Sequence, residues 1–107
     1  MSPRWLGRVL ARVRELAAQE KVFFTLKALR ELVELDMGLD EEDARGVLVK
    51  LVASEFAERV RSKGTGEWMY VFKPEVGGLR IYLKVILRAD CVVISFHEER
   101  DENHEDE

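Results

Sequence analysis

The spacing of the apolar residues changes once along the 107-residue chain, and this change constrains the fold more than any other feature. Up to Val52 the apolar residues recur at three- and four-residue intervals, which is the period of helices with one buried face. After Ser54 they alternate with polar residues, which is the period of half-buried strands. A helical half followed by a strand half predicts an α+β domain, in which N-terminal helices cover one face of a C-terminal antiparallel sheet.

Three helices are predicted in the first half. The first covers residues 5–17, and the second is capped by Thr25 and runs to Leu35. Asp40 caps the third, which has acidic residues in its first turn, where the helix dipole favours negative charge. The side chains expected to face inward from the second helix are Leu26, Leu29, Leu32 and Val33. The short segment KVFF, from Lys21, is expected to be extended.

Four strands are predicted in the second half, at residues 56–62, 67–73, 80–88 and 91–97. Ala89-Asp90 is interpreted as a two-residue hairpin loop between the last two, and this loop sets their register. Leu83 then lies opposite Phe96 on an apolar core face. On the other face Tyr82 lies opposite His97, with Cβ atoms about 5 Å apart.

The same alternation predicts the outward-facing residues of the other two strands. Trp68, Tyr70 and Phe72 suit the core, which turns Lys73 outward. Phe56 and Val60 also suit the core, which turns the two arginines of that strand outward. The exposed sheet face is therefore expected to hold Arg59, Arg61, Lys73, Tyr82, Lys84 and His97.

These residue types fit metal-free cleavage of RNA. That reaction needs a base for the 2′-hydroxyl, an acid for the leaving 5′-oxygen and cations for the charge on the phosphorane. Histidine can serve as acid or base near neutral pH, and arginine matches phosphate oxygens with two donors. The plainer alternative is that His97 ends a strand while Tyr82 covers apolar surface.

The charge is unevenly distributed. The chain has a formal charge of −4, but residues 98–107 (EERDENHEDE) carry −6, so the rest carries +2. We expect residues 1–97 to form the folded domain and residues 98–107 to form a disordered acidic tail. Basic residues are in excess between Arg59 and Arg88, as in a phosphate-facing surface or in a solvated sheet face.

Other functions find little support in the sequence. The single cysteine, Cys91, excludes an internal disulfide framework and suits a reducing cytosol. No apolar run is long enough to span a bilayer, and arginines interrupt the N-terminal apolar residues as they would not in a signal peptide. His97 and His104 lack diagnostic metal-ligand spacing, and no glycine-rich phosphate loop is present. We therefore expect a cytoplasmic protein without a cofactor or metal.

The chain resembles the MqsR family of bacterial toxin ribonucleases, within the wider RelE-like toxin fold. The resemblance rests on SEFAERV, Trp68, YVFKPEVGG, YLKV, VVISFHEE and the helical segment GLDEEDARGVLVKL. It covers nearly the whole chain before the tail. It implies an mRNA interferase, an endoribonuclease that arrests translation, and a cognate antitoxin of the DNA-binding helix-turn-helix type.

The resemblance also implies roles for individual residues. Tyr82 stands at the family's active-site tyrosine, and His97 stands at a family lysine. Met69 replaces a family glutamine, and another family lysine falls near Glu58 or Arg59. The strand alternation favours Arg59 for this position. The predicted catalytic residues are therefore Tyr82, His97 and Arg59, and the predicted RNA-binding residues are Arg61, Lys73 and Lys84.

Two other functions stay open at this point. Three helices followed by two strands also resemble a winged-helix DNA-binding module, with KGTG (63–66) at the wing tip. Its third helix would offer only Arg45 and Lys50 as cations against three acids, which is poor chemistry for DNA recognition. Alternatively, the chain is a catalytically inactive homologue that still binds the antitoxin.

Overall fold

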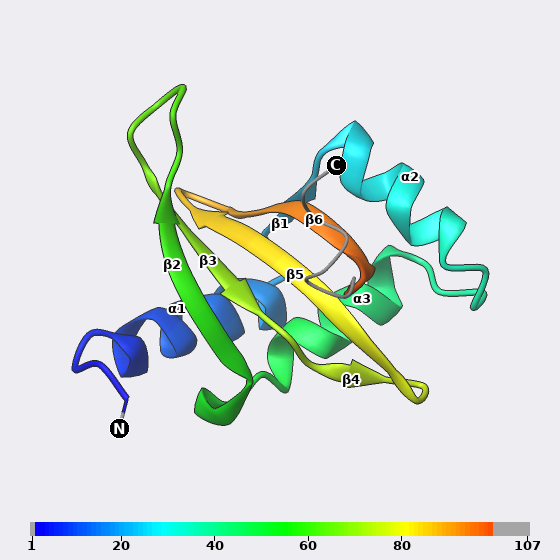
Figure 1. Ribbon diagram of the computed structural model, residues 1–107, viewed down its shortest axis with the longest axis horizontal. Helices are drawn as coiled ribbons and strands as arrows, with labels where there is room; N and C mark the ends of the chain where they lie inside the picture. Colours follow the sequence, from blue (N-terminus) through cyan, green and yellow to red (C-terminus); the bar gives the residue numbers. More distant parts are fainter. Residues whose placement is uncertain (1, 100–107) are drawn as a thin grey trace.

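A computed structural model describes residues 2–99 as one layer of sheet with helices packed against it (Figure 1). The helices are α1 (Leu6–Ala18), α2 (Leu26–Glu34), α3 (Glu41–Val49) and the short 3-10 helix η1 (Ala53–Glu55). The strands are β1 (Val22–Phe24), β2 (Phe56–Arg61), β3 (Trp68–Phe72), β4 (Glu75–Val76), β5 (Leu79–Leu87) and β6 (Cys91–Glu98). The predicted α+β class is confirmed, and the arrangement is consistent with the RelE-like fold that the resemblance implies.

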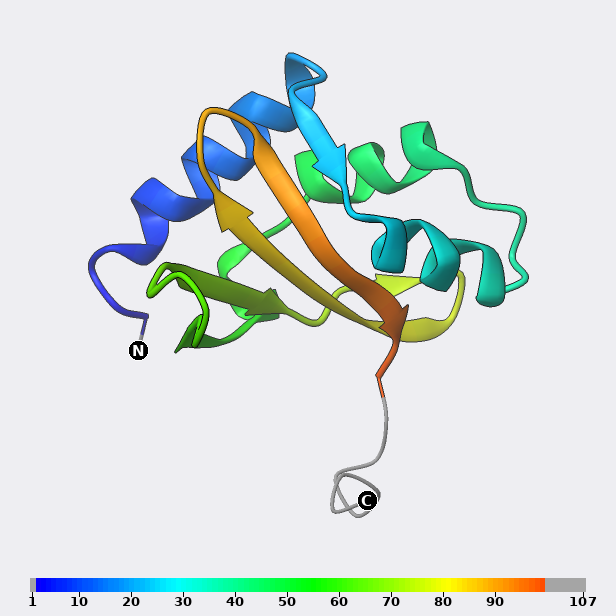
Figure 2. The same ribbon diagram turned by 90° about the horizontal axis from the view of Figure 1, so that it is seen from above.

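The sheet has the order β1-β6-β5-β3-β2, and β4 pairs with β5 beside this path. Strands β2, β3, β5 and β6 form the predicted antiparallel meander. Strand β1, which was expected only to be extended, runs parallel to β6 and forms one edge of the sheet (Figure 2). The sheet is therefore mixed, because β1, which lies between α1 and α2 in the sequence, pairs in parallel with the last strand.

Helix α2 leads directly out of β1 and covers the exposed edge of β6 beyond it (Figure 2). Thr25 caps the helix as predicted, since its hydroxyl accepts a hydrogen bond from the amide of Ala28 at 3.1 Å. The amide of Phe96, which has no strand partner on that side, donates to the Glu31 carboxylate at 2.9 Å. A helix therefore satisfies a sheet edge that would otherwise be open.

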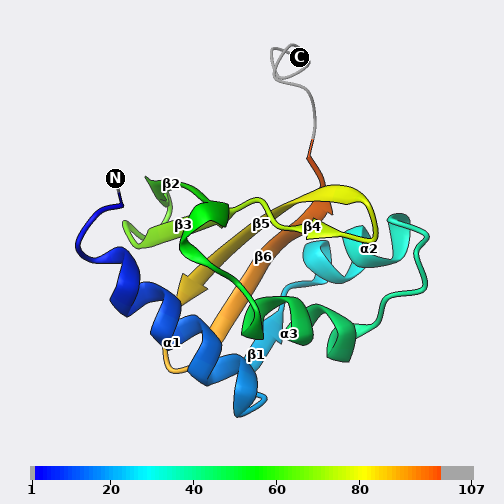
Figure 3. The ribbon, with the colours of Figure 1, turned by 90° about the horizontal axis from the view of Figure 1, so that it is seen from below.

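Helices α1 and α3 lie side by side on one face of the sheet (Figures 1 and 3). The predicted cap of α3 is confirmed, because Asp40 and Asp43 each accept a hydrogen bond from the other's backbone amide, at 2.8 and 3.0 Å. The core between these helices and the sheet includes Val13, Leu48, Leu83 and Phe96, all fully buried. The apolar faces read from the sequence therefore meet as expected.

The predicted orientation of α2 is partly wrong. Leu32 is buried as expected, but Leu26 and Val33 are 73% and 76% exposed. Ala28, fully buried, takes their place against the core. The helix is short, and its apolar residues spread over two adjacent sides. The spacing of these residues therefore did not decide which side faces the core.

The predicted two-residue loop between β5 and β6 is also wrong. Leu87 pairs with Cys91, so the loop has three residues, 88–90, and the predicted pairs nearest the turn are shifted by one. The ladder then skips Ile94, an irregularity that restores the predicted register beyond it. Tyr82 does pair with His97, as predicted, but a longer loop and a compensating bulge produce this pairing.

A second bulge reverses the predicted faces of β2. Phe56 pairs with Phe72 and Glu58 pairs with Val71, so Ala57 is an extra residue in the ladder. From Glu58 onward each residue of β2 faces opposite to the prediction. Arg59 and Arg61 therefore lie on the face that packs against α1, and Glu58 lies on the face that holds Tyr82.

We call these two surfaces the helix face, which α1 and α3 cover, and the open face, which lies opposite. The register places the following residues on the open face: Glu58, Val60, Met69, Val71, Tyr82, Lys84, Ile86, Val92, Ser95 and His97. The winged-helix alternative is not supported, because β5 and β6 form the middle of the sheet. Within residues 2–99, no helix is long and apolar enough to cross a membrane.

Candidate active site on the open face

Tyr82 and His97 form a stacked pair on the open face. They are opposed across β5 and β6, their ring centroids lie 5.0 Å apart, and their ring planes differ by 9°. Both side chains are half-buried, so each ring keeps one edge accessible to solvent. This pair, predicted from the sequence, brings an imidazole and a phenol to one point of the surface.

The surroundings of each ring fix where its proton lies. The Nδ1 atom of His97 is 2.8 Å from the carbonyl oxygen of Glu98. A carbonyl can only accept a hydrogen bond, so Nδ1 carries the proton and Nε2 of the neutral ring is free to accept one. Burial, and next the negative charge of Glu58, raise the pKa of Tyr82, while Lys73 acts in the opposite direction. Tyr82 is therefore a neutral hydrogen-bond donor at physiological pH.

Two predicted cations accompany this pair. The Lys84 ammonium lies 6.0 Å from the centroid of the Tyr82 ring. The Lys73 ammonium is bound to the carboxylate of Glu99 at 2.6 Å, and Arg80 lies 3.9 Å from the same carboxylate. Glu98 and Glu99, which the sequence analysis assigned to the tail, thus belong to the folded part, while residues 100–107 lie outside the described residues.

Helix α2 contributes two further charged residues that the sequence analysis missed. The Lys27 ammonium is 2.9 Å from the Ser95 hydroxyl and 2.8 Å from the Glu31 carboxylate. Burial raises the pKa of Glu31, but hydrogen bonds from Lys27 and the Phe96 amide outweigh it, and the net pKa is lowered. Their four-residue spacing is typical of a helical ion pair, but nothing in the sequence places α2 against β6.

The predicted positions of Arg59 and Arg61 are wrong, because both arginines lie on the helix face. The guanidinium carbon of Arg59 is 4.2 Å from the ring centroid of Trp5 and 3.8 Å from that of Trp68. Arg61 lies 4.1 Å from the centroid of Trp68. Neither arginine belongs to the surface around Tyr82, and Glu58 takes the position that was predicted for Arg59.

An apolar row crosses the open face beside the charged residues. Five residues that follow one another in register across the sheet make up this row: Phe23, Val92, Ile86, Met69 and Val60. Phe23, at the β1 edge, is 58% exposed. The open face thus combines a polar half, around Tyr82, with an apolar half nearer the β5–β6 turn.

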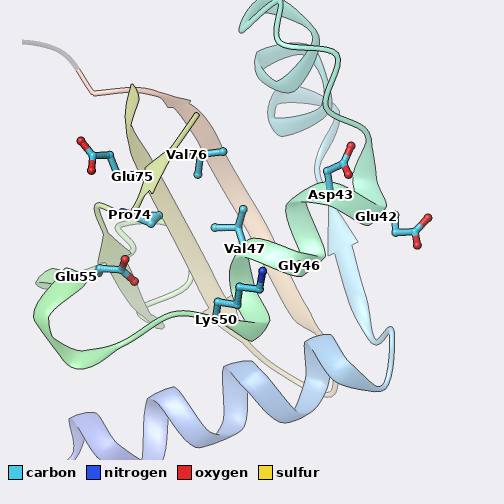
Figure 4. A pocket seen from close by; sticks show the side chains of 9 residues that line it. All are labelled: Glu42, Asp43, Gly46, Val47, Lys50, Glu55, Pro74, Glu75 and Val76. Carbon is cyan, nitrogen blue, oxygen red and sulfur yellow. The ribbon is translucent and has the colours of Figure 1, made fainter. Parts of the chain in front are cut away.

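Two hollows of the surface each contain four acidic residues in their lining. A cleft of about 480 Å³ lies between α3 and the segment from Pro74 to Val76, where Val47 and Lys50 project toward it (Figure 4). Its acidic lining residues are Glu42, Asp43, Glu55 and Glu75. A smaller hollow of about 290 Å³ lies between α2 and His97 and is lined by Glu31, Glu34, Glu98 and Glu99. The acids beside His97 make the smaller hollow unfavourable for an anion, whereas Lys84 lies on the Tyr82 side of the pair.

Other candidate chemistry finds no support within residues 2–99. Cys91 is fully buried, and burial raises the pKa of its thiol to about 12, which leaves it an unreactive core residue at neutral pH. No three histidine, cysteine, aspartate or glutamate side chains of this part of the chain come together as metal ligands. The open face therefore offers proton transfer and phosphate binding by side chains.

Comparison with known families assigns the chain. The family model described as "Motility quorum-sensing regulator, toxin of MqsA" matches residues 8–98. This match includes all six strands and all three helices except the first two residues of α1. No curated protein matches the chain.

Proposed function

Since the chain belongs to the MqsR family of toxins, we propose that this toxin of a toxin–antitoxin system is an endoribonuclease that cleaves mRNA without a metal ion and arrests translation. The observation that carries the proposal is the stacked pair of Tyr82 and His97, with Lys84 beside it. This group of residues supplies a proton acceptor, a proton donor and a cation, which are the three requirements of cleavage by the neighbouring 2′-hydroxyl.

In the proposed mechanism His97 is the general base. Its Nε2 atom takes the proton of the 2′-hydroxyl, and the 2′-oxygen then attacks the adjacent phosphorus. The hydrogen bond from Nδ1 to the Glu98 carbonyl holds the ring in the tautomer that this step needs. The new oxygen–phosphorus bond gives a 2′,3′-cyclic phosphate.

Tyr82 is the proposed general acid. Its phenol gives a proton to the 5′-oxygen as the bond from phosphorus to that oxygen breaks, which releases a 5′-hydroxyl end. Burial and Glu58 keep Tyr82 protonated, and an alkoxide is a stronger base than a phenolate, so this transfer is downhill. Lys84 stabilises the negative charge on the phosphorane.

Besides His97 and Met69, the site departs from the family pattern at one further position. Because of the bulge at Ala57, an acid, Glu58, stands on the open face where the resemblance implies a lysine and the strand alternation predicted Arg59. Lys27 approaches from α2 on the other side of the pair, where it contacts Ser95. We propose that Lys27, Lys73 and Lys84 provide the phosphate contacts of this toxin.

Family membership implies an antitoxin partner. We propose that this antitoxin is a helix-turn-helix DNA-binding protein and that the toxin acts in the cytoplasm. An inactive toxin that only binds its antitoxin is the second candidate, and the acid at Glu58 and the ion pair on Lys73 are the observations that favour it.

The purified protein should cut single-stranded RNA in the presence of EDTA and leave 2′,3′-cyclic phosphate and 5′-hydroxyl ends. The His97→Ala variant, prepared in the same way, is the control for contaminating ribonuclease and should lose this cleavage. Cleavage that stops on addition of EDTA and returns with Mg²⁺ would contradict the metal-free mechanism. No cleavage by a folded, antitoxin-binding protein would establish the inactive alternative.

A further inference from the structure

Two tryptophans and two arginines form a cluster on the helix face, beyond the open-face site. Trp5 comes from the residue before α1, Arg59 and Arg61 from β2, and Trp68 from β3. Arg59 lies against both indole rings, within 4.2 Å of their centroids, and Arg61 lies 4.1 Å from the Trp68 centroid. We call these four residues the Trp–Arg cluster.

The arginines of this cluster have no acidic partner within the part of the chain that the structure describes. Arg61 donates one hydrogen bond, to the carbonyl of Gly66 at 2.8 Å, and Arg59 forms no ion pair there. Carboxylates accompany other cations of the sheet: Arg88 binds Glu67, and Lys73 binds Glu99. The indoles hold the planar guanidinium groups in place, while the N–H donors along their edges are left for another acceptor.

The chain around the cluster is basic. Residues 2–11 and 59–63 contain Arg4, Arg8, Arg59, Arg61 and Lys63 and no aspartate or glutamate, whereas Arg12, the next arginine of α1, is paired with Glu15 at 3.5 Å. Arg8 follows Trp5 by three residues, so both lie on one side of α1. A protein with a net charge of −4 thus concentrates positive charge at one edge of its sheet.

We propose that the Trp–Arg cluster is a second binding site for single-stranded RNA, distinct from the cleavage site. The guanidinium edges bind phosphate oxygens, and the accessible part of the half-buried indole rings stacks against nucleobases. This combination of planar donors and aromatic surface favours RNA over an acidic peptide, which needs the donors but not the stacking surface. The inference rests on the proposed function, because it assigns a further contact to the same substrate.

The position of the cluster suits a strand that continues past the cleavage site. Glu58 and Arg59 are neighbours in β2, the edge strand, yet they face opposite sides of the sheet. The edge strand lies two strand spacings from β5, or about 10 Å from Tyr82 across the sheet. RNA that leaves the open face there can pass around β2 and reach the cluster.

The direct test is RNA binding by the double variant Arg59→Gln/Arg61→Gln. The probe is a fluorescent single-stranded RNA with 2′-O-methyl groups, which lacks the attacking hydroxyl and stays intact. We expect this variant to bind the RNA at least about tenfold more weakly at low salt. The slope of log affinity against log salt concentration should become shallower by about 0.7 for each phosphate contact that is lost. A matched control, Lys21→Gln/Lys50→Gln, removes two exposed charges elsewhere and should bind as the wild type does.

A second variant separates the charge of the two arginines from their planar shape. Arg59→Lys/Arg61→Lys keeps both charges but loses the planar groups, so its salt slope should stay near that of the wild type while its affinity falls. Thermal unfolding should show that these variants are folded at the assay temperature. If the glutamine variant is unfolded, the lysine variant carries the test, and wild-type affinity in that variant overturns the proposal.

The remaining outcomes are distinguishable. Wild-type affinity of a folded glutamine variant for the RNA overturns this inference alone and leaves the cleavage site untouched. If the glutamine variant keeps its affinity for RNA but loses binding to the antitoxin, the cluster is a protein-docking surface instead. A wild-type protein that neither binds nor cuts RNA overturns the proposed function as well.

Discussion

The open-face site and the Trp–Arg cluster lie on opposite faces of one sheet, and their cations have different kinds of partner. Around the open-face site, two of the cations form ion pairs: Lys73 is bound to Glu99, and Lys27 is bound to Glu31. In the cluster, aromatic rings hold the cations and no carboxylate of residues 2–99 pairs with them. The first arrangement suits proton transfer beside a phosphate, and the second suits binding without chemistry. The basic residues of β2 and those of β5 therefore belong to two separate surfaces.

The largest difference between the two regions should appear in cells. Induced expression of the wild-type protein without its antitoxin should stop growth, and His97→Ala should abolish this effect because it removes the proposed base. Cell density after induction is the measurement. Growth arrest by His97→Ala at the same protein level would remove histidine from the mechanism.

The next effect concerns Tyr82. The Tyr82→Phe variant keeps the stacked ring but loses the proton donor, so we expect cleavage to slow by about 10²- to 10⁴-fold. The wild-type rate should not decline on the alkaline side until the pH exceeds 10, since the pKa of Tyr82 is raised above its usual value of 10.0. A rate that declines between pH 8 and pH 9, measured on folded protein, would contradict the assignment of Tyr82 as the acid.

A smaller effect is expected from the ion pair on the open face. Glu99→Gln should free Lys73 and strengthen RNA binding by roughly two- to fivefold at low salt, because surface ion pairs are worth about 0–1 kcal/mol. Glu98→Gln is the matched control, since its exposed carboxylate pairs with no cation among residues 2–99. Equal affinities of the two variants would show that Lys73 does not contact RNA.

The smallest effect concerns Glu67, the residue before Trp68. Hydrogen bonds from Arg88, at 2.6 and 2.9 Å, and from Thr65 lower the pKa of Glu67 from 4.5 to about 2. A lowered pKa stabilises the fold above pH 4.5, and this contribution is lost as the pH falls toward 2. Glu67→Gln should therefore flatten the dependence of stability on pH in that window, measured by denaturant unfolding. An unchanged dependence would show that the pair contributes nothing.

The sequence predicted the layers of the fold because hydrophobic periodicity reports directly on burial. It also predicted the contact of Tyr82 with His97, although the loop of residues 88–90 and the bulge at Ile94 compensate for each other in producing it. A ladder read by alternation has no means of detecting an extra residue, since a bulge changes the faces without changing the composition.

The same limitation explains the errors in the site. Because of the bulge at Ala57, Glu58 lies on the open face in place of the predicted Arg59. No local feature of the sequence indicates this bulge. Lys27 was missed because its role depends on the parallel pairing of β1 with β6, a contact between distant parts of the chain. Residues of the long central strand β5 were therefore placed on the correct faces, and those of the edge strand β2 after Ala57 were not.

The central claim is that the open face cleaves RNA while the Trp–Arg cluster only holds it. The most direct test is the steady-state cleavage of single-stranded RNA in EDTA by His97→Ala and by Arg59→Gln/Arg61→Gln. We predict that His97→Ala lowers kcat by at least about a hundredfold, whereas the arginine variant loses activity through a higher KM. A fall in kcat of the arginine variant as large as that of His97→Ala would contradict this division of roles.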